Sequence, residues 1–360
     1  MYISKFSAYL VTLVLYVGLA ACDEESVPPA AEPLPQWEED QRFLYDLRGQ
    51  YNAASDGNNL YLLGKKHLSH LELKDSVESV THSILWMDYN QNHKMPVTSQ
   101  ISLTADHQAV RAIPNSNPVL GNSDLYLHFP SLDTAFIGFG FPSFHMSDCM
   151  AINSRNEFLV LYYARTVPEE NIIKGLVVAT TTESYGPESN YLDTARTWAI
   201  DLPGYLYALY AFGEDFYVLV DAGTYKIDTT RTAHRVSDKA LYKMFTIDGR
   251  LYGLHNQELY TSHQGDDWEL VGNVDFDISL LNYQMVEDKT IAYYNSQLFH
   301  LEQKEGVIHY TELDNTGMES HKITSVARLG PRVYVTTLSG VFFKEYNSFL
   351  NPKEENALEE

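Results

Sequence analysis

Short apolar runs of strand length alternate with polar turns over most of this chain. From Asp248 to Ser262 the sequence reads as a polar turn, an apolar strand, a second polar turn and another strand. A further apolar run, Tyr242–Ile247, precedes the first turn. The same order recurs in four other stretches: Asp56–His70, Gly213–Ile227, Glu287–Leu301 and Gly330–Lys344. Short strands separated by turn signals predict antiparallel meanders.

These units repeat at an interval of about 40 residues, the length of a propeller blade. Tyr217, Tyr252, Ala292 and Tyr334 occupy matching positions, at spacings of 35, 40 and 42 residues. Further copies around Tyr61, Ala109 and Leu159 bring the number of units to seven. Four-stranded blades closed into a ring leave only short, protected edges. We therefore expect an all-β protein with a β-propeller of about seven four-stranded blades. Six or eight blades, or a pair of two-sheet sandwiches, are the alternatives.

The N-terminus carries a different pattern. Residues 1–21 contain one charge, Lys5, and an apolar run from Tyr9 to Leu19. The run is shorter than the roughly 20 residues of a membrane span and is typical of a signal peptide. It ends in Leu19-Ala-Ala-Cys22, which resembles the lipobox of bacterial lipoproteins. We expect residues 1–21 to be a lipoprotein signal peptide and Cys22 to carry palmitate and other acyl chains that anchor the chain to a membrane. An ordinary secretory signal is the alternative.

Residues 22–41 are acidic and rich in proline, with too few apolar residues for a core, and they predict an extended stalk after the lipidated cysteine. The acidic cluster Asp23–Glu25 is similar to the surface-export signal of Bacteroidota lipoproteins. It predicts an outer-membrane lipoprotein exposed on the cell surface, with a periplasmic orientation as the alternative. The propeller is expected over residues 42–350, and residues 351–360 form an acidic C-terminal tail.

Charge narrows the choice of partners. Without residues 1–21 the chain has 24 Lys and Arg against 48 Asp and Glu, a net charge of −24. Such a surface repels phosphate backbones, so nucleic acid is not expected as a partner. Cys149 is the only other cysteine, and no disulfide can form within the acylated chain. Cys149 is expected to be a buried, inert thiol.

One turn carries a further pattern. Thr261, Gly265 and Trp268 match the pattern Ser/Thr-x-Asp-x-Gly-x-Thr-Trp, with His263 in place of the aspartate and Asp267 in place of the threonine. This resembles the Asp-box of sialidase-like propellers, and the chain resembles Bacteroidota surface lipoproteins of that type.

In that family the Asp-box is a structural turn: glycine permits a tight backbone and tryptophan packs between strands. The resemblance implies that Trp268 is largely buried. A second, stretched copy is expected from Thr181–Glu183 to Thr197–Trp198, with Ser184–Ala195 inserted in its turn.

Catalytic and metal-binding patterns are weak. Sialidases carry an Arg-Ile-Pro motif, and the nearest match, Arg111–Pro114, has an inserted alanine. Asp88–Asn92 imitates half of a calcium loop but lacks the glycine and the final glutamate that such loops need. His67 and His70 lie three residues apart, on opposite faces of a strand. We therefore predict no catalytic residue, no metal and no cofactor.

A ligand is expected at the face formed by the turns between second and third strands and by the blade-to-blade connections. The insertion Ala164–Asn171 lies in such a turn, and loops on a rigid scaffold commonly carry function. The candidate ligand-binding residues in these turns are Lys65, Arg165, Glu169, Glu170, Asp221, His255, Asn256 and Asn295.

The leading functional hypothesis is a binding or interaction protein for an extracellular glycan or protein. Some of the 26 tyrosines could stack on sugar rings, although strands and blade interfaces also favour aromatic residues. The alternatives are a glycan-processing enzyme and a structural subunit of an outer-membrane complex. Convergent carboxylates at the mouth of the central channel would favour the enzyme, and an aromatic-lined mouth without them would favour binding.

Overall fold

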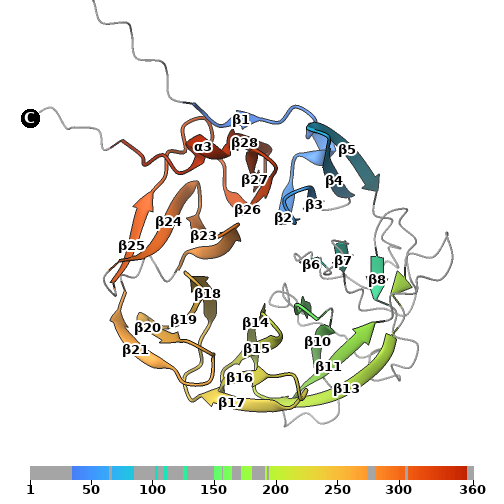
Figure 1. Cartoon of the computed structure of the whole chain (residues 1–360), viewed down its shortest axis with the longest axis vertical. Coiled ribbons are helices and arrows are strands. Elements are labelled where there is room, and N and C mark those ends of the chain that lie inside the picture. The colour runs from blue at the N-terminus through green and yellow to red at the C-terminus, as the bar shows by residue number, and fades with distance from the viewer. Residues whose placement is uncertain are drawn as a thin grey trace, which may run out of the picture. The chain divides into compact units, whose positions relative to one another are not determined.

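Tight turns fold the chain back on itself into seven four-stranded sheets, called blades 1–7 here (Figure 1). The count refers to the part of the chain that the computed structural model describes. This part comprises residues 35–64, 67–84, 102–103, 109–111, 125–127, 150–155, 157–163, 172–180, 191–192, 194–274, 280–304 and 307–354. The chain divides into two units, Met1–Pro35 and Gln36–Glu360, and all seven sheets belong to the second.

The four blades with the simplest order use consecutive strands, each antiparallel to the next. Blade 1 contains β2 (Gln50–Ser55), β3 (Asn59–Gly64), β4 (His67–Lys74) and β5 (Val77–Ile84). Blade 4 contains β14 (Leu206–Phe212), β15 (Asp215–Val220), β16 (Gly223–Ile227) and β17 (Ala233–Ser237). Blade 5 contains β18 (Lys243–Ile247), β19 (Arg250–His255), β20 (Glu258–Ser262) and β21 (Glu269–Asn273). Blade 6 contains β22 (Asn282–Val286), β23 (Lys289–Tyr294), β24 (Gln297–Lys304) and β25 (Val307–Glu312).

The other three blades depart from this order. Blade 3 contains β9 (Met150–Ile152), β10 (Glu157–Tyr163), β11 (Ile172–Thr180) and β13 (Thr194–Pro203). Blade 2 contains β6 (Ser102–Leu103), β7 (Ala109–Arg111), β8 (Leu125–Leu127) and β12 (Tyr191–Leu192). Blade 7 contains β26 (Ile323–Leu329), β27 (Arg332–Thr337), β28 (Val341–Glu345) and β1 (Glu38–Glu39). Two short helices, η1 (Tyr45–Leu47) and α3 (Tyr346–Phe349), flank blades 1 and 7.

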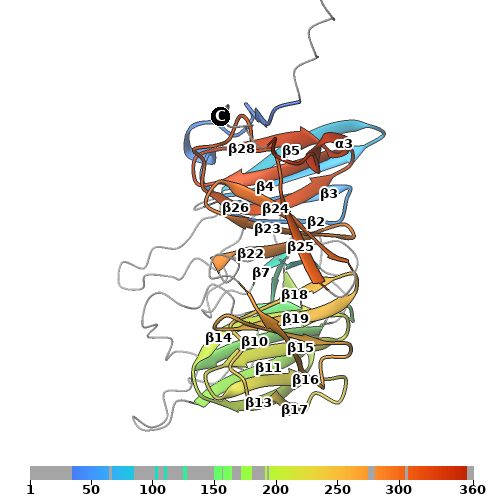
Figure 2. The ribbon, with the colours of Figure 1, turned by 90° about the vertical axis from the view of Figure 1, so that its left-hand side faces the viewer.

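The blades pack in a ring. Separate apolar clusters join blades 3 and 4, 4 and 5, 5 and 6, 6 and 7, and 7 and 1. The innermost strand of blade 2, β6, contacts the innermost strands of blades 1 and 3, which completes the circle. Figure 2 shows the propeller from the side, with strands that run between its two faces. The expectation of a propeller of about seven four-stranded blades is confirmed.

The N-terminal strand closes the ring. In β1, Glu38 and Glu39 face Phe343 and Phe342 of β28. Trp37 is buried, and its indole N–H donates a hydrogen bond of 3.0 Å to the Asp314 carbonyl. The predicted start of the propeller at residue 42 is therefore wrong, because residues 37–40 already belong to blade 7. At the other end, the Lys353 N–H donates to the Glu312 carbonyl, so the folded part also extends beyond residue 350.

One of the matched positions is shifted by one residue. Tyr217, Tyr252 and Tyr334 each sit third from the turn in the second strand of their blade, and so does Ile291 rather than Ala292. Ile291 packs against blade 7, whereas Ala292 packs against blade 5. A slip of one residue reverses the face of a strand, so the alignment of Ala292 with the three tyrosines is wrong.

The segment between β11 and β13 contributes to a second blade. Tyr191 and Leu192 form β12, which pairs with β8 of blade 2. The predicted second Asp-box copy spans this segment, and its Thr181–Glu183 part lies outside the described residues. The described remainder is not a single turn, because β12 joins a neighbouring sheet before β13 begins.

Candidate functional site

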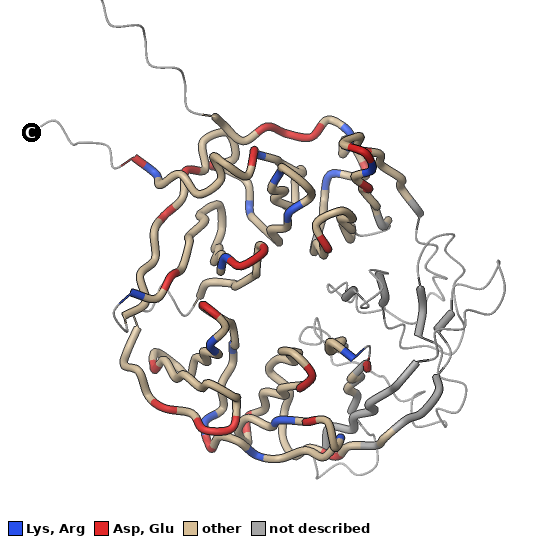
Figure 3. The backbone as a smooth tube through the Cα atoms, in the orientation of Figure 1, with Lys and Arg blue, Asp and Glu red and all other residues tan. Residues whose placement is uncertain are grey.

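The two faces of the propeller are built from different turns. In each regular blade, the turn between the second and third strands lies at the same end as the connection from the preceding blade, and we call this side the connection face. The opposite face carries the other two turns of each blade. Acidic and basic positions are spread around the circumference of the described ring (Figure 3), so charge alone does not single out a site.

Asp221, a predicted ligand-binding residue, fixes the connection that enters blade 4. Its carboxylate accepts a hydrogen bond of 2.7 Å from the Tyr205 N–H. Its own N–H donates to the Tyr205 carbonyl at 3.0 Å. The preceding Gly204 has φ +93°, and a Cβ there would lie 2.0 Å from the Asp221 carboxylate. Asp221 therefore holds a left-handed backbone bend in place.

His255 and Asn256 have a similar role in blade 5. The His255 Nδ1–H donates to the Ala240 carbonyl at 2.9 Å, since a carbonyl can only accept. Nε2 of His255 then accepts from the Asn256 amide at 3.3 Å. The Asn256 carbonyl in turn accepts from the Tyr242 hydroxyl. The pair thus joins the β19–β20 turn to the connection from blade 4.

Asn295 lies in the β23–β24 turn with φ +50°, and its carbonyl accepts from the Ile323 N–H of blade 7 at 2.7 Å. Asp221, His255, Asn256 and Asn295 therefore all lie on the connection face, and each holds its turn against a neighbouring segment. The other candidates, Lys65, Arg165, Glu169 and Glu170, lie outside the described residues, as does Cys149.

The sequence reasoning missed two tyrosines on this face. Tyr205 and Tyr207 are 52% and 49% exposed, while Leu206 between them is buried. Tyr207 has no residue opposite it in β15: Leu206 faces Val220, and Ala208 faces the adjacent Leu219. This bulge turns Tyr207 away from both blade interfaces. The Pro203-Gly204 pair before Tyr205 was the available signal for an irregular strand start.

The same bulge recurs at the start of the innermost strand of other blades. β2 skips Tyr51, whose side chain lies outside the described residues, and β26 skips Thr324. Before β18, the Tyr242 N–H donates to the Leu254 carbonyl, although Lys243 is the residue that faces Leu254. Tyr207 and Tyr242 are therefore equivalent positions of neighbouring blades, next to the centre of the ring.

Lys243 and Tyr283 extend this group of side chains from blade 5 to blade 6. The Lys243 ammonium donates to the Leu281 carbonyl, and burial lowers the pKa of Lys243 to about 8. The Tyr283 ring stacks on Phe245 with centroids 3.9 Å apart. Burial, together with the nearby Tyr242 and Tyr210, raises the pKa of Tyr283, which keeps its hydroxyl protonated. We call Tyr205, Tyr207, Tyr242, Lys243 and Tyr283 the tyrosine wall.

The turn with the Asp-box pattern lies on the opposite face. The Thr261 hydroxyl donates to the Leu251 carbonyl at 3.0 Å, and the Ser262 hydroxyl accepts from the Gly265 N–H at 2.8 Å. Trp268 is partly buried against the core between blades 4 and 5, and its indole N–H donates to the Gly265 carbonyl at 3.2 Å. Thr261, Gly265 and Trp268 thus shape the turn itself.

The described residues contain no group of three His, Cys, Asp or Glu side chains that could hold a metal ion. Within the same residues, no helix is long and apolar enough to cross a membrane.

Comparison with solved structures shows the fold. Virginiamycin B lyase from Staphylococcus aureus superposes with a TM-score of 0.54 at 8% identity, over 86% of this chain and 98% of the lyase. A catalytically inactive variant of that lyase with quinupristin gives 0.53 at 10% identity, over 86% and 97%. BamB from Moraxella catarrhalis gives 0.41 at 13% identity, over 84% of each chain.

No protein-family model matches the chain, and no curated protein matches it. Because these identities are so low, the structural similarity shows the fold alone. The chain is an all-β protein with a seven-bladed propeller fold, and the resemblance to the sialidase-like Asp-box family remains a prediction.

Proposed function

We propose that this protein is a binding protein whose connection face holds an extracellular glycan on the tyrosine wall. The observation that carries the proposal is the pair of exposed rings at Tyr205 and Tyr207, on a backbone fixed by Asp221 and by the bulge of β14. A tyrosine ring offers an apolar face and a polar tip, which together match the faces and hydroxyl groups of a sugar.

The chemistry of the described wall favours binding over glycan hydrolysis. Hydrolysis by the usual route needs two carboxyl groups that flank the scissile bond. Asp221 is the single carboxylate among the described candidates on this face, and it accepts the Tyr205 N–H. A protein ligand is the second candidate, because tyrosines are also frequent anchors of protein interfaces.

The test is a glycan-array screen with the purified mature chain, followed by titration of the strongest ligand. Tyr205→Ala and Tyr207→Ala should each weaken binding about 30-fold, the effect of losing an aromatic anchor worth about 2 kcal/mol. Tyr310→Ala is the matched control, because Tyr310 is 47% exposed on the outer strand β25. Equal affinities of the three variants would remove the tyrosine wall from the site.

The proposal includes the location of the protein. We infer that Cys22 is lipidated and that the propeller is held at the outer membrane on the cell surface. The support is the Leu19-Ala-Ala-Cys22 pattern and the acidic residues after it. Cys22→Ser should abolish incorporation of labelled palmitate and leave the precursor unprocessed by the lipoprotein peptidase. If the variant still carries the label, the anchor lies elsewhere.

A further inference from the structure

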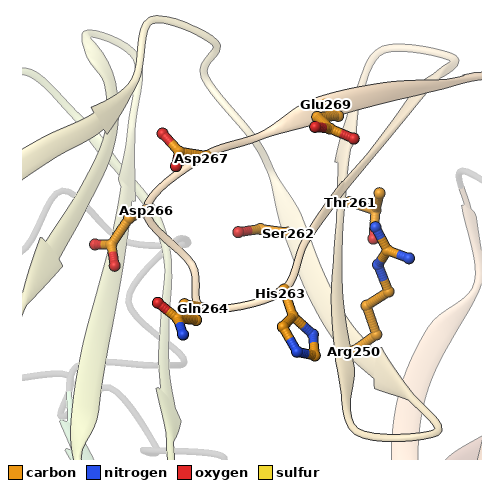
Figure 4. Close-up of a pocket in the computed structure, with 8 residues that line it drawn as sticks. All are labelled: Arg250, Thr261, Ser262, His263, Gln264, Asp266, Asp267 and Glu269. Carbon is orange, nitrogen blue, oxygen red and sulfur yellow. The ribbon is translucent and has the colours of Figure 1, made fainter.

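Three buried side-chain atoms of the described residues have no hydrogen-bond partner: Gln50 Oε1, Arg155 Nε and Arg250 Nε. Both arginines are only partly buried, and Arg250 lines a pocket at the turn of blade 5 (Figure 4). Gln50, the first residue of β2, is 0% exposed. A fully buried polar atom without a partner is costly and rare, so the surroundings of Gln50 need a physical explanation.

Gln50 and His67 meet across the strand that lies between them. They belong to β2 and β4, which flank β3, and Gly64 of β3 faces Gln50. A Cβ on Gly64 would lie 2.1 Å from Cε1 of the His67 ring. Because Gly64 has no side chain, the ring reaches over β3, and its Nε2 lies 2.7 Å from Gln50 Nε2. His67 is 4% exposed, so this contact is closed to solvent.

The contact fixes the protonation state of His67. Gln50 Nε2 also lies 2.7 Å from the Leu47 carbonyl oxygen. A carbonyl oxygen can only accept, so one N–H of the Gln50 amide donates to Leu47 and the other donates to His67. His67 Nε2 is then the acceptor of a neutral ring whose proton is on Nδ1. Burial and the nearby His82 lower the pKa of His67, and Asp46 acts in the opposite sense, so the neutral ring is favoured.

Through Leu47, the Gln50 amide holds the connection between blades 7 and 1. Leu47 ends η1, which links β1 of blade 7 to β2 of blade 1. Within this short helix, the N–H groups of Leu47 and Arg48 each donate to a carbonyl three residues earlier, at 3.2 Å. Arg48 also pairs with Glu39 at 3.0 Å, but that pair is exposed and such pairs contribute little. The buried bond from Gln50 is therefore important for keeping η1 in place.

We propose that Leu47, Gln50 and His67 form an acid-sensitive switch that releases η1. When His67 Nε2 gains a proton, it can no longer accept the Gln50 N–H, and the two N–H groups repel each other. Gln50 can bind the charged ring only by turning its Oε1 toward it, which gives this orphan atom a partner. The same turn takes the amide nitrogen away from the Leu47 carbonyl. Acid therefore loosens the connection between blades 7 and 1, whether or not a ligand is bound.

The groups that face His67 set the pH range of the switch. Among the described residues, His82 of β5 and Asp46 of η1 act on its charge. The Ser69 hydroxyl, 2.7 Å from His82 Nδ1, can donate or accept, so protonation of His82 breaks no bond. The pKa of His67 is lower in the folded protein than in the unfolded chain, where it is near 6.5. The stabilising bond is therefore fully present above the unfolded pKa and is lost as the pH falls through the folded pKa.

Hydrogen exchange of the mature chain at pH 7.5 and at pH 5 tests the proposal. Mass spectrometry gives protection factors, which correct for the intrinsic effect of pH on exchange, for the peptide that contains η1. Protection of η1 should be about tenfold lower at pH 5, the effect of losing one hydrogen bond. Protection of β19 in blade 5 is the internal reference and should not change. Unchanged protection of η1, or an equal fall in β19, would overturn the proposal.

Two variants and a matched control assign the effect. His67→Gln has no ring to protonate, so η1 should have the same protection at both pH values, whatever its level. Gln50→Met lacks the amide, so η1 should be weakly protected at both. His70→Gln is the control: Asn59 Nδ2 donates to Asp56, so Asn59 Oδ1 accepts from the His70 Nε2–H at 2.8 Å, and protonation of His70 keeps this bond. His70→Gln should therefore retain the tenfold change. A tenfold change that persists in His67→Gln would show that His67 is not the switch.

Discussion

A buried ion pair supports the closure of the ring at the scale of single residues. The Lys344 ammonium donates to the Asp314 carboxylate at 2.7 Å, with side chains 1% and 11% exposed. Burial alone would raise the pKa of Asp314, but hydrogen bonds from Lys344 and Thr316 outweigh it and lower the pKa below its usual value. The ammonium also lies over the Trp37 ring, 5.9 Å from its centroid.

Lys344→Met should therefore lower the free energy of unfolding by about 3 kcal/mol at pH 7, because it leaves a buried carboxylate without its partner. The pKa of the Asp314 carboxyl group is lower in the folded protein than in the unfolded chain, where it is near 3.9. The ion pair therefore stabilises the fold fully above the unfolded pKa, and this contribution is lost as the pH falls through the folded pKa. The difference between wild type and variant should narrow in urea titrations from pH 5 to pH 3. Lys353→Met, at an exposed pair, should change stability by less than about 0.5 kcal/mol.

Gly265 is required for two reasons, of which the Asp-box pattern indicates only the first, the tight backbone of the turn. Its φ is +79°, and a Cβ there would lie 1.9 Å from the Tyr217 hydroxyl oxygen. Gly265→Ala should cost about 1–2 kcal/mol for the left-handed backbone, and more because of the overlap. In a Tyr217→Phe background the cost should be smaller, since the hydroxyl is gone. Thermal melts of the double-mutant cycle measure this coupling, and an additive cycle would contradict the contact.

At the scale of elements, the strands could be predicted from sequence and the roles of the turn residues could not. Apolar alternation and turn spacing located the second strand of each blade, because these signals are local. Ala292 was misaligned with Tyr217 because Ile291–Tyr294 is apolar at every position. Such a run has no alternation of period two that would reveal a slip of one residue.

The candidate site was predicted only in part. The connection face was correctly identified for Asp221, His255, Asn256 and Asn295, since the turn order follows from an antiparallel meander. Their partners lie in the blade-to-blade connections, at Tyr205 and Ala240, and at the first residue of β26, Ile323. Such contacts leave no local signal. The bulge that exposes Tyr207 also depends on pairing with β15, which the sequence of β14 alone does not specify.

At the scale of the whole molecule, closure of the ring depends on residues that resemble a linker. Two truncations of the mature chain separate the residues that act as a linker from those that close the ring. A chain that begins at Gln36 should melt like the full mature protein, because it keeps Trp37 and β1. A chain that begins at Arg42 loses both and should be less stable by about 3–5 kcal/mol, the cost of removing one buried tryptophan. Equal melting temperatures would show that β1 contributes nothing to closure.

The pairing of β1 with β28 also means that the ring can close only after the whole chain has been made. The first strand to emerge during synthesis or export is the outer strand of the last blade, and its partner arrives near the end of the chain. Until then the edge of β1 has no native neighbour, and contacts between such distant segments form slowly. A chain that ends before Val341 lacks Val341 and Phe342 of β28, which pack with blades 1 and 6. We therefore expect it to expose part of these apolar flanks and to aggregate.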